Sequence, residues 1–152
     1  MKSQLDAQIK KVDAEKIRPL RHSELRQGKP FSSTSYLRDH ENDTFHMACF
    51  VGEKIVTCAT FYPESTDKIK SEKAYRLRGM ATDSEFQRKG YAKKLMIESF
   101  RELKGKGCDL LWCNARLVAI EFYQSLGFKT LGNIFDVEDI GPHYYMHKEI
   151  AK

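Results

Sequence analysis

The feature that most constrains the fold is a double switch of hydrophobic periodicity between residues 73 and 114. Residues 73–82 (KAYRLRGMAT) have the pattern of a strand, whereas residues 90–104 carry apolar side chains at helical spacing. Residues 108–114 (CDLLWCN) return to a largely apolar run, as expected of a strand covered on both faces. A strand, an amphipathic helix and a second strand in this order predict a mixed α/β domain built around one sheet.

The rest of the chain supplies the other elements. Strand patterns cover residues 7–12, 44–51, 55–62, 128–137 and 143–150, and helical segments cover residues 13–25 and 116–125. Asp13 can cap the first of these helices, in which Pro19 is tolerable only near the first turn. Residues 52–54 form a hairpin turn, and the polar loop 27–43 allows a short helix around Ser35–Arg38.

Length and composition are those of one ordinary globular domain, so we expect residues 1–152 to form a single domain. Of the 152 residues, 41% are hydrophobic and 31% are charged. No run approaches the ~20 apolar residues of a membrane span. Met1 to Leu20 lacks the apolar run of a secretory signal. We therefore expect a cytoplasmic protein with no membrane partner.

The cysteines are expected to be reduced and buried, because all four lie in apolar segments: Cys49, Cys58, Cys108 and Cys113. Cys108 and Cys113, followed by His143 and His147, could suggest a zinc site. However, the two cysteines lie five residues apart in one predicted strand and would point to opposite faces. No metal is therefore expected.

Positive charge gathers where the strand 73–82 leads into the next helix. The chain carries a net charge of +5, which favours nucleic acid, an anionic membrane surface or a phosphorylated cofactor as partner. Gly90 opens the helix, and the first N–H groups of a helix lack internal partners and suit a phosphate. Arg88, Lys89, Lys93 and Lys94 add charge around this point.

Three segments of the chain resemble the GNAT family of N-acetyltransferases. Residues 87–92 (QRKGYA) match the family's Gln/Arg-x-x-Gly-x-Gly/Ala motif and follow the strand residues Met80-Ala81-Thr82. Residues 119–128 (AIEFYQSLGF) resemble the family's second acetyl-CoA segment. Residues 141–146 (GPHYYM) resemble the ending of small bacterial-type members.

This resemblance implies a fold, a co-substrate and a set of contacts. The fold would be a mostly antiparallel sheet of about six to seven strands, with a parallel pair at the cofactor cleft and flanking helices. Main-chain groups of Met80 and Thr82 would pair with the pantetheine arm of acetyl-CoA, and the amides of residues 88–92 would hold its pyrophosphate. The implied cofactor-binding residues are Met80, Ala81, Thr82, Gln87, Arg88, Lys89, Gly90, Tyr91, Ala92, Asn114, Ala119 and Tyr123.

The implied reaction is direct attack of a primary amine on the thioester in a ternary complex. The tetrahedral oxyanion needs preplaced N–H donors, and a bulge near Gly79 and Met80 would leave a main-chain N–H free for it. Tyr123 would lie near the sulfur and protonate the leaving thiolate. A phenol with an ordinary pKa of about 10 can do this within hydrogen-bond reach.

The general base is the role that the sequence leaves open. Some protein-acetylating members carry a glutamate on the strand before the phosphate loop, and here Arg76 aligns with that position. His46, His143 and Glu72 are alternatives, with His143 the best of the histidines, and a water chain is another. Arg76 and Arg78 instead suggest a substrate that bears negative charge.

Two other functions compete with acetyl transfer. One is an acetyl-CoA-binding sensor without transfer activity, which the missing carboxylate keeps open. The other is a basic nucleic-acid-binding module, but the aromatic side chains mostly occupy alternating, core-like positions, so no nucleic-acid partner is expected. The expected partners are acetyl-CoA and an amine of an unidentified small molecule or peptide. The oligomeric state is undecided, and a homodimer stays open.

Overall fold

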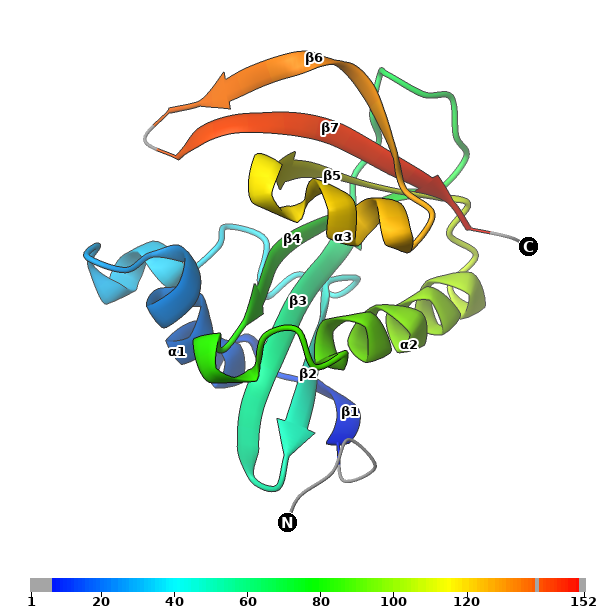
Figure 1. The fold of residues 1–152 in the computed structure, drawn as a ribbon. Helices are drawn as coiled ribbons and strands as arrows, with labels where there is room; N and C mark the ends of the chain where they lie inside the picture. The colour runs from blue at the N-terminus through cyan, green and yellow to red at the C-terminus, as the bar shows by residue number, and fades with distance from the viewer. Residues whose placement is uncertain (1–6, 139, 151–152) are drawn as a thin grey trace. The chain divides into compact units, whose positions relative to one another are not determined.

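The computed structural model describes residues 7–138 and 140–150, which form a mixed α/β structure (Figure 1). The strands are β1 (Ala7–Val12), β2 (Phe45–Val51), β3 (Lys54–Pro63), β4 (Ala74–Thr82), β5 (Leu110–Arg116), β6 (Lys129–Val137) and β7 (Gly141–Glu149). The α-helices are α1 (Ala14–Leu25), α2 (Tyr91–Gly105) and α3 (Ile120–Ser125). Three short 3₁₀ helices join them: η2 (Phe31–Thr34), η3 (Ser84–Phe86) and η4 (Leu117–Ala119).

The strands of the described residues belong to one seven-stranded sheet in the order β1-β2-β3-β4-β5-β7-β6. The pairs β1–β2, β2–β3, β5–β7 and β6–β7 are antiparallel. β4 and β5 are parallel, with Ala74 opposite Leu110 and Arg76 opposite Trp112. The predicted mixed sheet with one parallel pair is therefore confirmed.

The chain divides into two compact units. The first unit comprises Met1–Tyr62 and Gly79–Glu102, and the second comprises Pro63–Arg78 and Leu103–Lys152. None of the described helices is long and apolar enough to cross a membrane.

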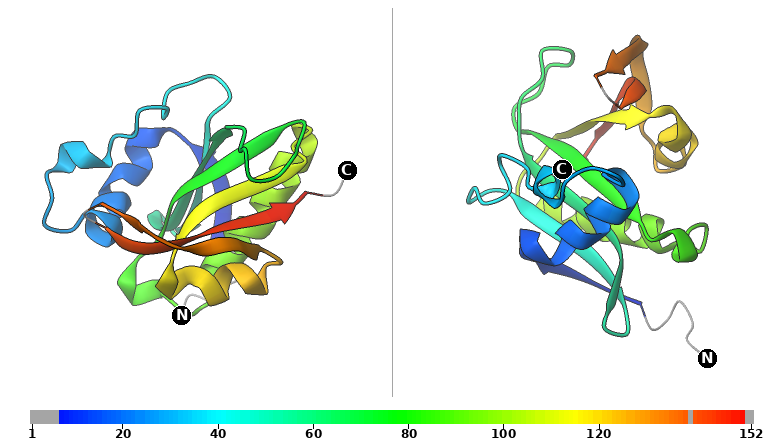
Figure 2. Two further views of the ribbon diagram at one scale, coloured as in Figure 1. Left: turned by 90° about the horizontal axis from the view of Figure 1, so that it is seen from above. Right: turned by 90° about the vertical axis from the view of Figure 1, so that its left-hand side faces the viewer.

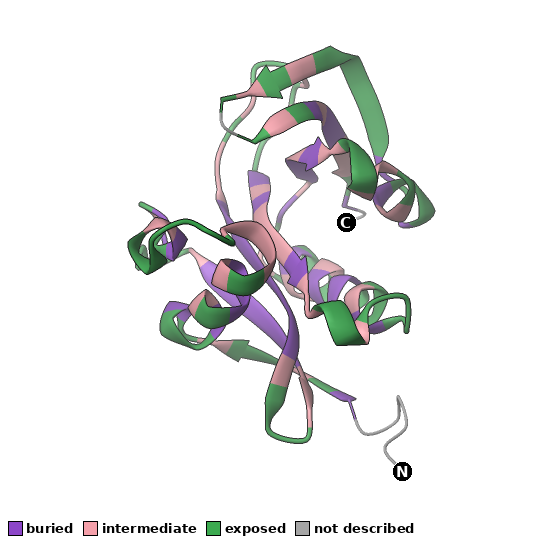
Figure 3. Ribbon diagram, turned by 60° about the vertical axis from the view of Figure 1, so that its left-hand side comes forward, coloured by how far each residue is buried: buried purple, intermediate pink, exposed green. Residues whose placement is uncertain are grey.

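The core of the first unit forms where α1 packs on the sheet. Ile17 and Leu20 lie three residues apart on one face of α1, and they contact Ala48, Cys58 and Ala81 of β2, β3 and β4. The buried residues follow β2 and β3 in Figure 3. Small side chains on the strands let the helix approach closely, so the helix holds the end of β4.

The core of the second unit forms around the parallel pair. Ala74, Leu110, Trp112 and Tyr145 make one buried cluster from β4, β5 and β7. β6 and β7 lie side by side in both views of Figure 2, and β6 is mostly exposed because it is the last strand of the sheet. Trp112, expected in the core, is 7% exposed.

Three local predictions need correction. Pro19 lies in the middle of α1, where the buried residues Ile17, Leu20 and Arg21 hold the helix together around it. Asp13 occupies the N-cap position, but its side chain makes no capping bond. The expected helix at Ser35–Arg38 is wrong, because the 3₁₀ turn lies at Phe31–Thr34.

Side-chain bonds explain the position of this turn. The Ser33 and Thr34 hydroxyls donate to the carbonyl oxygens three residues earlier, each at 2.7 Å. The Asp39 carboxylate accepts the Tyr36 N–H at 3.0 Å and holds the following residues in a separate turn. Such local bonds compete with helix formation.

Candidate functional site

The segment between β4 and α2 contains two residues in the left-handed conformation. Arg88 and Gly90 both take left-handed conformations, with φ of 62° and 86°, which is uncommon for a residue with a Cβ such as Arg88. The Lys94 N–H bonds the Gly90 carbonyl at 3.1 Å and starts the helical ladder. The N–H groups of Tyr91, Ala92 and Lys93 therefore have no acceptor inside the helix.

Side chains fix the base of this loop and leave its tip open. The Gln87 amide donates to the Thr82 carbonyl at 3.2 Å, and the Asp83 carboxylate accepts the Glu85 N–H at 2.9 Å. Residues 87–90 are exposed. Lys89 lies over the Phe86 ring, with 5.7 Å between its Nζ and the ring centroid. The loop thus presents the cations Arg88 and Lys89 to solvent.

The end of β4 carries the other predicted contacts of the first unit. Gly79 has φ of 64°, and a Cβ there would lie 3.0 Å from Cε2 of Tyr36. The glycine thus allows both a left-handed bend and the close approach of Tyr36, as its position inside a strand pattern predicts. Ala81 belongs to the core, whereas Met80 and Thr82 are half-buried.

Tyr123, on α3 of the second unit, lies in an aromatic cluster. Its ring meets Phe122 and Phe128 edge-on, with centroids 5.3 and 5.2 Å away. Burial, together with the nearby Cys113 thiol, raises the pKa of Tyr123 well above its usual value. The phenol therefore keeps its proton at neutral pH. Ala119 lies half-buried at the start of α3.

Asn114 lines a pocket of about 570 Å³ in the second unit. The other lining residues come from the loop after β3 and from three strands: Glu64, Ser65, Thr66, Asp67, Lys68, Trp112, Phe135 and Tyr145. Successive side chains of a strand point to opposite faces. Trp112 and Asn114 of β5 therefore face this pocket, whereas Cys113 between them points to the opposite face of the sheet. Asn114 as a cofactor contact stays a prediction.

The histidines proposed as bases differ in their surroundings. His143, on β7, is 5% exposed and stacks on Phe135. Its Nδ1 lies 2.8 Å from the Gly141 carbonyl oxygen. Because a carbonyl can only accept, Nδ1 carries the proton and Nε2 is left as the basic nitrogen. The third candidate, Glu72, is exposed in the loop before β4.

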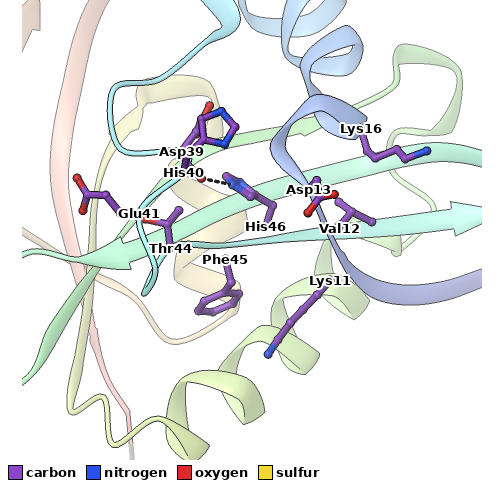
Figure 4. A pocket seen from close by; sticks show the side chains of 10 residues that line it. All are labelled: Lys11, Val12, Asp13, Lys16, Asp39, His40, Glu41, Thr44, Phe45 and His46. Atoms are coloured by element: carbon purple, nitrogen blue, oxygen red, sulfur yellow. Dashed lines mark hydrogen bonds between the residues drawn. The ribbon is translucent and has the colours of Figure 1, made fainter.

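His46 has both ring nitrogens occupied within a buried polar network. Its Nε2–H donates to the Asp39 carbonyl at 3.0 Å (Figure 4). Its Nδ1 lies 2.8 Å from the Thr60 hydroxyl. Burial, together with the positive charge of Arg21, outweighs the bond to Asp39 and its negative charge and lowers the pKa of His46. His46 and Asp39 form part of the wall of a second pocket, of about 610 Å³, in the first unit. A base role for His46 is therefore poorly supported.

The centre of this network is Arg21, which the sequence analysis missed. Arg21 is fully buried and pairs with Asp39 through two bonds of 2.7 and 3.0 Å. It also donates to the Thr34 carbonyl and the Thr60 hydroxyl, and its guanidinium lies 3.8 Å from the centre of the Tyr36 ring. The network attaches the loop 27–43 to β3. Helical spacing could have predicted that Arg21 is buried, since Ile17, Leu20 and Arg21 share one face of α1.

The strand position that aligns with a glutamate in some family members holds Arg76, whose charge is already paired. Its Nη1 lies 3.3 Å from the Glu64 carboxylate, and its guanidinium lies 4.8 Å from the centre of the Trp112 ring. The suggestion that Arg76 recognises a negatively charged substrate is therefore not supported. Glu64 was also missed. The available signal was its place directly after β3, across the loop from the start of β4.

The cysteines are all free and buried, as predicted. Cys108 precedes β5 rather than lying in it, so the argument from opposite strand faces does not apply to it. Within residues 7–138 and 140–150, no three His, Cys, Asp or Glu side chains form a group that could hold a metal ion.

Comparison with known proteins gives these features a context. Residues 14–128 match the model of the Acetyltransferase (GNAT) family. The N-acetyltransferase YitI of Bacillus subtilis (strain 168), itself named as uncharacterized, is 32% identical over 143 residues, which cover 94% of this chain and 96% of YitI.

Two solved structures share the fold. A proposed N-acetyltransferase from Lactobacillus plantarum superposes with a TM-score of 0.80 at 16% identity, covering 95% of this chain and 99% of that one. An aminoglycoside 6'-N-acetyltransferase complexed with coenzyme A superposes with a TM-score of 0.77 at 14% identity. The match covers 95% of this chain and 98% of that one. The family match over most of the sequence and the similarity to YitI give the assignment: the chain belongs to the GNAT family of acetyltransferases.

Proposed function

We propose that this GNAT N-acetyltransferase takes its acetyl group from acetyl-CoA and transfers it to a primary amine by direct attack in a ternary complex. The observation that carries the proposal is the loop at residues 87–92. It combines two left-handed residues with N–H groups that have no acceptor inside the helix, at the start of a fifteen-residue helix. Aligned N–H groups and the positive end of the helix dipole favour a pyrophosphate there. The coenzyme A bound to the aminoglycoside acetyltransferase of the same fold supports this choice.

The other proposed contacts also concern acetyl-CoA, the acetyl donor. Met80 and Thr82 would bond the pantetheine arm through their main chains, and Ala81, Gln87, Asn114 and Ala119 would complete the binding surface. The left-handed bend at Gly79 supports an N–H donor for the oxyanion beside Met80. We assign both compact units to one acetyltransferase domain, because the family match at residues 14–128 includes parts of each.

Tyr123 is our candidate for the acid that protonates the departing thiolate. Its raised pKa keeps the proton on the phenol until negative charge develops on the sulfur. His143 is retained as a weaker catalytic candidate because its Nε2 is the basic nitrogen. Four free, buried thiols support a cytoplasmic location.

Two measurements test the function. Acetyl-CoA should raise the melting temperature of the protein by mass action. A panel of primary amines should then release the free thiol of coenzyme A at a rate that depends on the amine. Thermal protection without thiol release for any amine would favour an acetyl-CoA sensor. No protection at all would refute the assignment of the loop.

A further inference from the structure

We propose that the pocket lined by residues 64–68, Trp112, Asn114, Phe135 and Tyr145 binds the acceptor as an organic dication, and that Glu64 takes the proton from its reacting ammonium. The substrate class is a primary amine with a second cationic group on an apolar stem. This inference rests on the proposed acetyl transfer and adds the acceptor and the base. This aromatic pocket lies in the second unit.

Part of the wall of the aromatic pocket consists of aromatic rings, whose faces attract cations. Trp112 and Tyr145 stack with centroids 5.5 Å apart and an interplanar angle of 24°. The protein's own cations already occupy positions over both rings. Lys68 Nζ lies 5.5 Å from the Tyr145 centroid, and the Arg76 guanidinium lies 4.8 Å from that of Trp112. An aromatic face that holds an alkylammonium such as Lys68 can hold that of a substrate.

The lining also carries charged groups that can bind a cation. Two carboxylates, Glu64 and Asp67, line the pocket with one ammonium, Lys68, and the Arg76 guanidinium pairs with Glu64 beside it. The hydroxyls of Ser65 and Thr66 and the amide of Asn114 add neutral polar groups. A volume of about 570 Å³ suits a small molecule. Because Lys68 is exposed, its side chain can leave the Tyr145 ring when a substrate cation arrives.

Glu64 is the carboxylate of this lining that the structure holds in place. Its backbone N–H donates to the Ala74 carbonyl at 3.1 Å, and its carbonyl accepts the Trp112 indole N–H at 2.9 Å. The Arg76 guanidinium holds the carboxylate itself at 3.3 Å. Asp67, in contrast, is exposed. A base must be positioned before its strength matters, and this selects Glu64.

The proton balance of the reaction is simple. The substrate ammonium gives one proton to the Glu64 carboxylate, and the free amine forms a bond to the acetyl carbon. The carbon–sulfur bond breaks with its electron pair on sulfur. The second proton lost by nitrogen ends on the sulfur through Tyr123, and Glu64 releases its proton to solvent. The products are the acetylated amine, free coenzyme A and one proton.

The chain offers a direct measure of binding, because its single tryptophan is Trp112 in the wall of the aromatic pocket. Tryptophan fluorescence of the full chain is titrated with 1,5-diaminopentane and with 5-aminopentanoate at equal ionic strength. These probes share the amine and the stem and differ in the sign of the distal charge. We expect the diamine to bind at least about tenfold more tightly. Equal or tighter binding of 5-aminopentanoate would overturn the proposal.

Matched variants test the role of Glu64. With acetyl-CoA and the diamine, Glu64→Gln should lower kcat by about 10²-fold or more. Asp67→Asn, in the same loop, should raise KM and leave kcat within about twofold. Glu64→Asp guards against misfolding, because it keeps the negative charge beside Arg76 and should retain the wild-type melting temperature while kcat falls. An unchanged kcat for Glu64→Gln, or equal damage from Asp67→Asn, would refute the assignment.

Failure here can be told apart from failure of the proposed function. If 5-aminopentanoate releases thiol faster than the diamine, the protein is an acetyltransferase and the aromatic pocket is not its acceptor site. If the diamine binds but no amine releases thiol, acetyl transfer and the role of Glu64 both fail. Faster thiol release with the diamine, lost in Glu64→Gln, supports both.

Discussion

Replacing Asp39 by asparagine tests the buried ion pair that attaches the loop 27–43 to the sheet. The side chains of Arg21 and Asp39 are 0% and 1% exposed, so water cannot solvate the guanidinium once its counter-charge is gone. Removing one partner of a buried pair costs about 3–5 kcal/mol. Asparagine keeps one acceptor oxygen, so we expect the loss in the free energy of unfolding to be at the lower end, about 3 kcal/mol. Urea unfolding at neutral pH, followed by far-UV circular dichroism, measures this loss.

The dependence on pH gives this prediction a second test. Burial alone would raise the pKa of Asp39, but bonds from Arg21 and the Tyr36 N–H and the charge of Arg21 outweigh it, so the pKa is lowered. A carboxyl whose pKa is lower in the folded protein than in the unfolded chain stabilises the folded state. This contribution is complete above the pKa of the carboxyl in the unfolded chain, about 3.9. The difference between wild type and Asp39→Asn should therefore persist from neutral pH to about pH 4 and shrink below it.

Asp43→Asn is the matched control, because Asp43 is an exposed aspartate of the same loop. We expect it to change stability by no more than about 0.5 kcal/mol. A loss below about 1 kcal/mol for Asp39→Asn would contradict the reasoning, since the guanidinium would then have found other compensation.

Three further predictions concern the cofactor loop, the acid and the thiols. Gly90→Glu should weaken acetyl-CoA binding in calorimetry at least about tenfold, or 1.4 kcal/mol. Gly90→Ala, equally strained at φ of 86°, should weaken it less. Tyr123→Phe should lower kcat by about 10²–10⁴-fold with little change in acetyl-CoA affinity, and a change confined to KM would refute its role as acid. Four free thiols should titrate after denaturation under non-reducing conditions, and only two would indicate a disulfide. In the folded protein the thiols should react slowly, because burial raises the pKa of Cys58 and Cys113 to about 12.

Elements whose periodicity reflects burial were predictable from the sequence. The helix at residues 90–104 and the strand at 73–82 appear as Tyr91–Gly105 and Ala74–Thr82, because Leu95, Met96 and Leu103 face the core. Phe31–Thr34 was not predictable in the same way. Its turn depends on short side-chain bonds at Ser33 and Thr34 and on Asp39, and hydrophobic patterns do not report such bonds.

The candidate site also has one part that was predictable from the sequence and one part that was not. Residues 87–92 are contiguous, so a local motif with a glycine at a left-handed position was enough to predict the loop. The Arg21–Asp39 pair and the Arg76–Glu64 pair join residues 18 and 12 positions apart. No local spacing rule reaches across such distances. Polar contacts of this kind become visible only when the fold brings the two segments together.

The Arg76–Glu64 pair has a consequence for how a GNAT chain can acquire a base. A carboxylate carried by a strand is positioned by the sheet itself, whereas one in a loop needs other groups to hold it. Here Arg76 takes the strand position and holds Glu64 from it, while Trp112 fixes the Glu64 backbone and also forms the wall of the aromatic pocket. Arg76→Glu would therefore place two carboxylates side by side, and their repulsion would raise the pKa of one of them. Simple restoration of the glutamate that some family members carry should lower activity, and the Arg76→Glu, Glu64→Arg exchange should recover part of it. Full activity of Arg76→Glu alone, measured as thiol release with the diamine, would show that Arg76 is not needed to hold the base in place.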